Sequence, residues 1–373
     1  KILIENKKDI KIAKNYKIKA NLMDRLLLTE ERVNSMAKDI KNIATLPNPL
    51  NKILNKSLRP NGLEIFKVSV PLGVVSVIFE SRPNVASDVA ALCIKSGNSV
   101  ILKGGKEAKH TTEYLIRLIK KELRKTKISS DVVSSLKSYD RNATNILFKM
   151  DNFIDVLVPR GGKKLIESIR ANSNIPVFSH LDGICHTYID KFAKKSMAID
   201  VVLNAKMRRT SICGATETVL CHSDIADEIM PILIKKLQEL ACIVKGDSKV
   251  MKYNKNVSKA NEKDWSTEYL DAIVSVKIVS NLQKAINHVN KYSSGHTDSI
   301  ITEDKKSAYT FLHSVESAIV MHNTSTQFAD GAEFGLGAEI GISTGKLHAR
   351  GPVSLEGLTT YKYIVKGKGQ LRT

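Results

Sequence analysis

Short β-branched runs alternate with longer amphipathic segments along this chain, and that alternation limits it to α/β architecture. The clearest unit lies between residues 68 and 105. VSVPLGVVSVIFE (68–80) is a strand region broken by Pro71 and Gly73, and NSVILKGG (98–105) predicts a second strand. PNVASDVAALCIKSG between them predicts a helix that begins at its proline and is capped by its last glycine. Such a crossover implies a parallel sheet with helices on its faces.

The pattern continues toward the C-terminus. FIDVLVPRGG (153–162) predicts a strand that ends in glycines, followed by a helix in KKLIESIRANS and strands in IPVFSHLDG and ICHTYID. A second α/β segment is predicted from about 190 to 345, with strands near TETVLCHSD, IVSVKIVS, SIITED and SAIVMHN. Ligands of open α/β sheets bind at the carboxyl ends of strands, so the strand-end glycines are candidate phosphate-binding positions. Plain tight turns fit them equally well, because no Gly-x-Gly-x-x-Gly follows the first strand.

Composition narrows the class of protein further. The 373 residues, 42% of them hydrophobic, are enough for two domains. The net charge of +20 makes nucleic acid a candidate partner, but the lysines are spread along the chain, which favours solvated faces instead. A basic protein that binds nucleic acid therefore stays the less favoured alternative. No apolar run approaches the ~18 residues of a membrane helix, and five cysteines without a Cys-x-x-Cys pair favour a reducing cytoplasm.

One cysteine stands in a chemically suggestive setting. Cys213 lies in MRRTSICGATETVL (207–220). It follows the cations Arg208 and Arg209 of this segment and Lys206 directly before it. These cations could lower the pKa of the thiol and hold an anionic substrate group, whereas a small buried hydrophobe is the alternative interpretation. Cys93, Cys221 and Cys242 lie in apolar runs and are expected to serve packing, and the role of Cys185 stays open.

Several blocks carry a resemblance to a known family. They are ESRPNVASDVAALCIKSGNSVILKGG, VPRGGKKLI, HLDGICHTYID, NAKMRRTSICGATET, DWSTEYLD, SGHTDSIITED, EFGLGAEIGISTGKLHARGP and LTTYKY, in order from about residue 20 to the C-terminus. Together they resemble the gamma-glutamyl phosphate reductases, or glutamate-5-semialdehyde dehydrogenases, of the aldehyde dehydrogenase superfamily. The resemblance implies an aldehyde-dehydrogenase fold with a Rossmann-like NADP-binding domain at 1–189, a catalytic domain at 190–345 and an oligomerising tail at 346–373.

The resemblance also implies a reaction in proline biosynthesis. NADPH would reduce gamma-glutamyl phosphate to glutamate 5-semialdehyde and phosphate through a thioester. Cys213 matches the nucleophile of this family, and Asn84 matches a donor to the oxyanion. The cations Lys206, Arg208 and Arg209 are the expected substrate-binding residues. An acyl phosphate suits this chemistry because phosphate is a good leaving group for thiolate attack.

The cofactor residues are likewise carried over from the resemblance. Lys103, Gly104, Gly105 and Lys106 match the loop after one strand, Gly161 and Gly162 match the loop after another, and Glu333 and Phe334 match a segment that holds the nicotinamide ribose. NAD-preferring relatives place a glutamate where Lys106 stands, three residues after Lys103. A cation there suits the 2'-phosphate of NADPH, although Lys106 could also be one of many surface lysines. No metal is expected.

Two positions depart from related enzymes. Gly214 stands where many relatives have asparagine, and His180 stands where hydrolytic aldehyde dehydrogenases have a glutamate base. A reductase needs no base that would hydrolyse its thioester. His180 and Asp182 could also be plain turn residues.

The resemblance carries expectations about assembly as well. It implies a homo-oligomer, dimer or tetramer, built through a hairpin near 58–70 and the tail LTTYKYIVKGKGQ, and a functional contact with glutamate 5-kinase. Relatives begin roughly three dozen residues before ILIENKKDIKIAK, so we expect that segment to be absent here.

Overall fold

The computed structural model describes residues 1–18, 20–136 and 138–372, and its contacts divide the chain into two units. The first unit contains Lys1–Ser179, Gly335–Ile342 and Leu347–Thr373, and the second contains His180–Phe334 and Ser343–Lys346. The division therefore falls earlier than the expected position near 190. The reason is that the strand in ICHTYID pairs with strands of the second unit. The C-terminal segment returns to the first unit.

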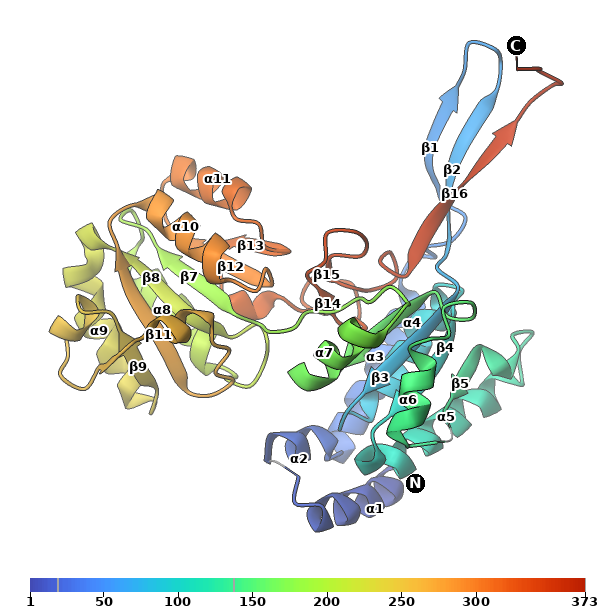
Figure 1. Ribbon diagram of the computed structural model, residues 1–373, viewed down its shortest axis with the longest axis horizontal. Coiled ribbons are helices and arrows are strands. Elements are labelled where there is room, and N and C mark those ends of the chain that lie inside the picture. Colours follow the sequence, from blue (N-terminus) through green and yellow to red (C-terminus); the bar gives the residue numbers. More distant parts are fainter. Residues whose placement is uncertain (19, 137, 373) are drawn as a thin grey trace. The chain divides into compact units, whose positions relative to one another are not determined.

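The first unit is built on a parallel sheet of order β5-β4-β3-β6. Its strands are β3 (Val74–Phe79), β4 (Ser99–Gly104), β5 (Val133–Ser135) and β6 (Val156–Arg160). Its helices are α1 (Ile2–Asn15), α2 (Ala20–Leu26), α3 (Glu30–Thr45), α4 (Asn84–Lys95), α5 (Lys109–Leu123), α6 (Arg141–Leu147) and α7 (Lys163–Asn172), with short 3-10 turns η1 (Lys106–Ala108) and η2 (Ser130–Val132). Helices α3, α4 and α5 pack on one face, and α6 and α7 pack on the other (Figure 1). The predicted strand-helix-strand unit is present as β3-α4-β4.

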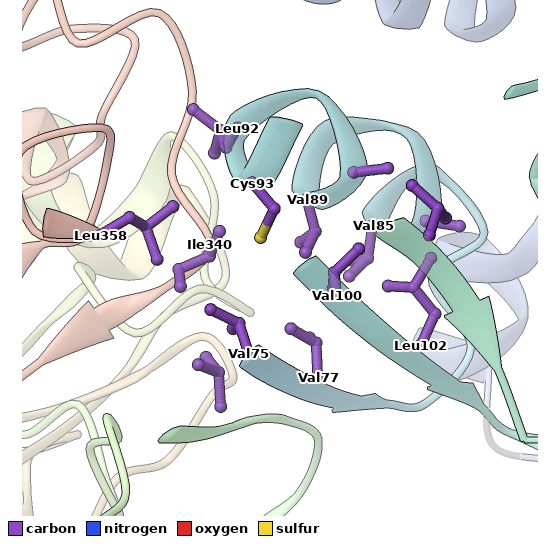
Figure 2. Packing of buried hydrophobic residues seen from close by; sticks show 14 of the residues in the cluster. Val75, Val77, Val85, Val89, Leu92, Cys93, Val100, Leu102, Ile340 and Leu358 are labelled. Atoms are coloured by element: carbon purple, nitrogen blue, oxygen red, sulfur yellow. The ribbon is translucent and has the colours of Figure 1, made fainter. Parts of the chain in front are cut away.

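Alternate residues of β3 explain both packed faces. Val75 and Val77 point into the cluster beneath α4, while Ile78 belongs to the cluster beneath α6 and α7. Figure 2 shows that Ile340 and Leu358, from the returning C-terminal segment, pack into the same cluster as Val75 and Val77. Each buried aliphatic side chain of this kind contributes about 1.5–3 kcal/mol. The C-terminal segment is therefore a structural part of the first unit.

Helix α4 begins and ends where its sequence predicted. Pro83 lies at its N-cap, and Gly97 follows its end with a φ of +73°, a left-handed conformation that glycine adopts without strain. Segment 175–183 differs from expectation, since IPVFSHLDG forms only an isolated bridge between Leu157 and Val177. Among the described helices, none combines the length and apolar character needed to span a membrane.

The second unit holds a seven-stranded parallel sheet of order β10-β9-β11-β8-β7-β12-β13. Its strands are β7 (Cys185–Ile189), β8 (Thr216–His222), β9 (Ile243–Gly246), β10 (Ser258–Lys259), β11 (Ile273–Val279), β12 (Thr297–Ile301) and β13 (Ile319–His322). Its helices are α8 (Lys195–Met207), α9 (Ser223–Glu239), α10 (Leu282–Tyr292) and α11 (Lys305–Ser314), with 3-10 turns η3 (Val250–Lys252), η4 (Glu262–Ser266) and η5 (Thr326–Phe328). Helices α8 and α9 cover one face and α10 and α11 the other. The α/β class predicted from the sequence is confirmed.

Three antiparallel strands form an arm of the first unit. β1 (Ile53–Leu58), β2 (Glu64–Pro71) and β16 (Thr359–Lys366) pair in the order β1-β2-β16, so the predicted hairpin and tail lie in one sheet. In Figure 1 the arm extends away from the four-stranded sheet. The remaining short strands, β14 (Ile342–Ser343) and β15 (Gly351–Pro352), lie in the returning segment.

Among the residues that the structure describes, none covers the two outer edges of the arm, β1 and β16, and apolar side chains of the arm are exposed. Leu58 is 69% exposed, Tyr363 61% and Val365 55%. An unpaired edge strand with apolar side chains is normally covered by another chain. We therefore expect an oligomer in light scattering at micromolar concentration, and we expect Tyr363→Glu combined with Val365→Glu to shift it toward the monomer. Phe153→Glu, a change at an exposed phenylalanine outside the arm, is the control and should leave the assembly unchanged.

Candidate active site

The candidate nucleophile lies in the loop that joins α8 to β8. The backbone N–H of Ala215 donates to the carbonyl of Ile212 at 3.0 Å and so closes a turn around Cys213. Cys213 is partly exposed, whereas the chain's other four cysteines are buried. Cys213 is thus the thiol that a dissolved reactant can reach.

Close packing beneath the loop holds the Cys213 backbone in place. A Cβ atom added to Gly183 would lie 2.2 Å from the Cys213 carbonyl oxygen, so the position accepts only glycine unless the loop moves. The Cys185 thiol donates to that same carbonyl oxygen at 3.1 Å. On the other side, the Gly183 N–H donates to Glu268 Oε1 at 2.9 Å. These contacts give Cys185, whose role the sequence left open, a part in positioning the loop.

Two histidines converge on the Cys213 sulfur. One ring nitrogen each of His180 and His296 and the Sγ atom of Cys213 all lie within 4.8 Å of one another. The two imidazole rings meet edge to face, with centroids 4.9 Å apart. His180, Cys213 and His296 precede β7, β8 and β12, which are neighbours in the parallel sheet. Their convergence therefore occurs at the amino ends of three adjacent strands.

This environment makes the Cys213 thiol acidic. Burial by itself would raise the pKa, but the charge of His296 and a hydrogen bond from His180 hold the pKa of the Cys213 thiol well below its usual range. Burial raises the pKa of Cys185 well above its usual value, and it raises the pKa of Cys93 and Cys221 to about 12. A lowered pKa supplies the thiolate that acts as a nucleophile at neutral pH.

The three predicted substrate cations occupy different environments. Lys206 is fully buried in an ion pair with Glu217, with a distance of 2.5 Å from Nζ to Oε2. Because the ammonium group is buried, a dissolved substrate cannot reach it. Lys206 is therefore not one of the substrate-binding residues that we propose. Arg208 and Arg209 are exposed, and the Arg208 Nε donates to the side-chain oxygen of Gln327 at 3.0 Å.

The glycine after Cys213 is closely packed. A Cβ atom on Gly214 would approach the Thr326 carbonyl oxygen to 3.1 Å, so an asparagine there would require the backbone of η5 to yield by a few tenths of an ångström. The departure at Gly214 thus matches the local packing. Nearby, burial raises the pKa of Glu268, while its bond to the Gly183 N–H opposes that shift.

The candidate cofactor residues of the first unit gather at the carboxyl ends of β4 and β6. Lys103 is only 7% exposed, and its ammonium donates to the Gly104 carbonyl at 3.2 Å and lies 5.3 Å from the Tyr139 ring centroid. Burial lowers the pKa of Lys103. Lys106 is exposed in η1. One cation at the strand end and a second one on the surface fit the hydroxyl and phosphate groups of a nicotinamide dinucleotide.

The glycines in these loops make room for glutamate side chains. A Cβ on Gly105 would fall 2.2 Å from Glu107 Oε1, and that oxygen accepts hydrogen bonds from the Ser81 N–H and hydroxyl at 2.7 and 2.9 Å. A Cβ on Gly161 would fall 2.6 Å from Glu80 Oε2, which accepts from the Gly162 N–H at 2.9 Å. The loop glycines therefore have a packing role whether or not they also contact a phosphate.

The remaining predicted residues lie apart in the chain. Asn84 begins α4 in the first unit, and one of its amide hydrogens is donated to Asp88 Oδ2 at 3.0 Å, which leaves the second for an oxyanion. Glu333 and Phe334 are exposed and end the main segment of the second unit. Their joint action with Cys213 in one cleft stays a prediction.

Sequence reasoning missed His296 altogether and left His180 open. The available signal was positional, because each histidine stands just before a predicted strand, in HLDGICHTYID and SGHTDSIITED. The general rule for open α/β sheets places ligand groups at the carboxyl ends of strands, whereas both histidines precede their strands. Strand order, which brings β12 beside β7, is what places His296 next to the thiol.

The reactive thiol and the α/β sheets define an enzyme class, and comparisons with known proteins agree. The model of the aldehyde dehydrogenase family matches residues 18–251 and 255–361. The chain is 50% identical over 371 residues to a gamma-glutamyl phosphate reductase of Rhodospirillum rubrum, covering 100% of this chain and 87% of that protein. It is 47% identical over 372 residues to one of Thermoanaerobacter pseudethanolicus, covering 100% and 90%.

Solved structures give the same result. The crystal structure of gamma-glutamyl phosphate reductase from Thermotoga maritima superposes with a TM-score of 0.97 at 38% identity, covering 100% of this chain and 90% of that one. An acetylating aldehyde dehydrogenase from Geobacillus thermoglucosidasius shares the fold, with a TM-score of 0.67 at 15% identity and 99% coverage of both chains. The chain therefore belongs to the aldehyde dehydrogenase family. Within it, the similarity runs to the gamma-glutamyl phosphate reductases.

The contrast among the five thiols predicts selective labelling. At neutral pH iodoacetamide should modify Cys213 first, because its lowered pKa leaves thiolate available while Cys93, Cys221 and Cys242 stay protonated and buried. Peptide mass spectrometry at increasing times measures the order. Denatured protein is the control, in which all five cysteines should react at comparable rates. Equal labelling of Cys93 and Cys213 in the folded protein would contradict the site.

Proposed function

We propose that this protein reduces gamma-glutamyl phosphate to glutamate 5-semialdehyde and phosphate with NADPH, through a thioester on Cys213. The observation that carries the proposal is the partly exposed thiol held between His180 and His296, with its pKa well below the usual range. The identity of 46–50% to proteins named gamma-glutamyl phosphate reductase supports this choice of substrate. The reaction is the second step of proline biosynthesis from glutamate.

Acylation follows from the arrangement around Cys213. The thiolate attacks the acyl carbon, the bond from that carbon to the phosphate oxygen breaks, and phosphate leaves with the electron pair. Negative charge on the acyl oxygen is received by the backbone N–H of Cys213 and the remaining amide hydrogen of Asn84. Arg208 and Arg209 attract the phosphate group before it leaves.

Reduction then regenerates the thiol. When bound, NADPH supplies the hydride that converts the thioester to an aldehyde. Cys213 departs as a thiolate, which the charge of His296 and the hydrogen bond from His180 stabilise. Lys103 and Lys106 would hold the dinucleotide in the first unit, with Lys106 as the residue for the 2'-phosphate and Glu333 as the residue for the nicotinamide ribose.

The proposed function is tested in the reverse direction. Glutamate 5-semialdehyde and NADP⁺ should yield NADPH only when inorganic phosphate is present. Turnover that requires coenzyme A and ignores phosphate would identify a CoA-acylating member of the family instead. A protein without either activity that binds duplex DNA tightly at physiological salt would favour the basic binding protein suggested by the net charge of +20.

Removing the nucleophile should abolish turnover and spare the fold. Cys213→Ala deletes the only atom that can carry the acyl group, so the rate should fall by roughly 10⁴ or more. The free energy of unfolding should change by no more than about 1 kcal/mol, because the side chain is partly exposed. Steady-state kinetics and urea unfolding measure the two effects.

The matched control is a buried cysteine of the same unit. Cys242→Ala opens a small cavity, so it should lower the free energy of unfolding more than Cys213→Ala does, while phosphate-dependent activity persists. Retained activity in Cys213→Ala would remove Cys213 from the mechanism.

Cofactor preference tests the role of Lys106. Lys106→Glu places a carboxylate beside the 2'-phosphate, so the ratio of kcat/KM for NADPH over NADH should fall by on the order of 100-fold. Lys121→Glu makes the same charge reversal on an exposed lysine of α5 and should leave the ratio unchanged. If both variants keep the wild-type ratio, another residue reads the 2'-phosphate.

A further inference from the structure

The cluster around Cys213 contains the donor atoms of a soft-metal site. A thiol sulfur and two imidazole nitrogens lie within 4.8 Å of one another, on Cys213, His180 and His296. Thiolate and imidazole are the ligands that Zn²⁺ prefers, and Zn²⁺ binds three protein ligands with a fourth position left open for water in many sites. The sequence contains no Cys-x-x-Cys pair and by itself predicts no metal.

His296 carries a second, independent indication of a ligand. Its side chain is fully buried, and its Nε2 has no hydrogen-bond partner among the described residues. Its Nδ1 lies 2.8 Å from the Thr297 hydroxyl. A histidine that binds a metal typically engages its other ring nitrogen with an oxygen, which fixes the tautomer and directs the free lone pair at the metal. The Thr297 hydroxyl can serve as that oxygen for His296 when Nδ1 carries the hydrogen, and the Cys185 sulfur is a second neighbour of Nδ1 at 3.7 Å.

The support around the ligands suits a cation as well. The sheet fixes the positions from which β7, β8 and β12 start, and His296 directly precedes its strand, while Cys213 and His180 lie in the loops that lead into β8 and β7. Zn–S bonds are about 2.3 Å long and Zn–N bonds about 2.0–2.1 Å. To form them, the three donor atoms must move somewhat closer to one another than they lie now. Cys213 and His180 are only partly buried, so their side chains have room for that movement and the cation has a route in.

We propose that this protein binds one Zn²⁺ ion through Cys213 Sγ and one ring nitrogen each of His180 and His296, with water as the fourth ligand. The bound ion occupies the thiolate and so reversibly blocks its attack on an acyl group. The binding site itself stands independently of the proposed function, and only the inhibition rests on it. Zinc acts here as an inhibitor at the thiol and takes no part in turnover.

Cobalt absorption tests the site directly. Co²⁺ added to the metal-free protein should produce a thiolate charge-transfer band in the near ultraviolet that saturates at one ion per chain and is abolished by Zn²⁺. Cys213→Ser should lose the band. His296→Gln should weaken Co²⁺ binding by more than the roughly 10–100-fold typical of losing a group outside the ligand set.

A histidine outside the cluster supplies the matched control. His313→Gln changes a histidine of α11 whose ring stacks on Tyr309, and it should keep the wild-type band and affinity. Circular dichroism verifies that each variant is folded. An unaltered band in Cys213→Ser, or the absence of a saturable band in the wild type under excess Co²⁺, would overturn the proposal.

A measurement on the wild type avoids any dependence on variant folding. Zn²⁺ at one equivalent should protect Cys213 from iodoacetamide, and EDTA should restore its labelling. The outcomes separate the two proposals. If the protein has phosphate-dependent reductase activity, but Zn²⁺ neither protects Cys213 from labelling nor inhibits turnover, the metal site alone is refuted. If the protein binds the metal saturably but has no reductase activity, the proposed function alone is refuted.

Discussion

Parallel pairing of β8, β7 and β12 is the constraint on which the chemistry of this protein depends. It aligns the starting points of three strands along one edge of the sheet, so that residues more than one hundred positions apart in sequence, such as His180 and His296, meet at one sulfur atom. The side chains themselves are short and ordinary. Their reactivity comes from the rigidity of the sheet and from the low polarity around it, which strengthens the interaction between imidazole and thiolate.

The two units use opposite ends of their strands. In the first unit, Lys103 lies at the carboxyl end of β4 and Gly161 follows β6, in agreement with the general rule for open α/β sheets. In the second unit, Cys213 and both histidines precede their strands. The general rule therefore finds the candidate cofactor groups of the first unit. It does not find His180 and His296, the neighbours of Cys213 in the second unit.

The local sequence pattern was sufficient to predict individual helices and strands, but it was insufficient to predict how they pack together. Helix α4 and strands β3 and β4 followed from apolar periodicity and from glycine and proline at their ends. The role of Cys213 as nucleophile is inferred from the resemblance of its block of residues and stays a prediction. Strand order, in contrast, is set by long-range packing, so neither the contact of His296 with the thiol nor the burial of Lys206 against Glu217 could be predicted from residue types. The strand predicted in segment 175–183 was wrong for a similar reason, because pairing also depends on the neighbours that the fold supplies. The segment forms one isolated bridge, between Val177 and Leu157.

The discontinuity of the first unit has a consequence for biosynthesis. Ile340 and Leu358 fill the same cluster as Val75 and Cys93, yet the ribosome makes them after nearly the whole chain is complete (Figure 2). The main segment of the second unit, His180–Phe334, is translated before both of the later segments of the first unit. Domains generally fold as units during synthesis. The N-terminal segment must therefore wait with an open apolar face until the C-terminal segment emerges, which makes this interval the point at which chaperones have the most to protect.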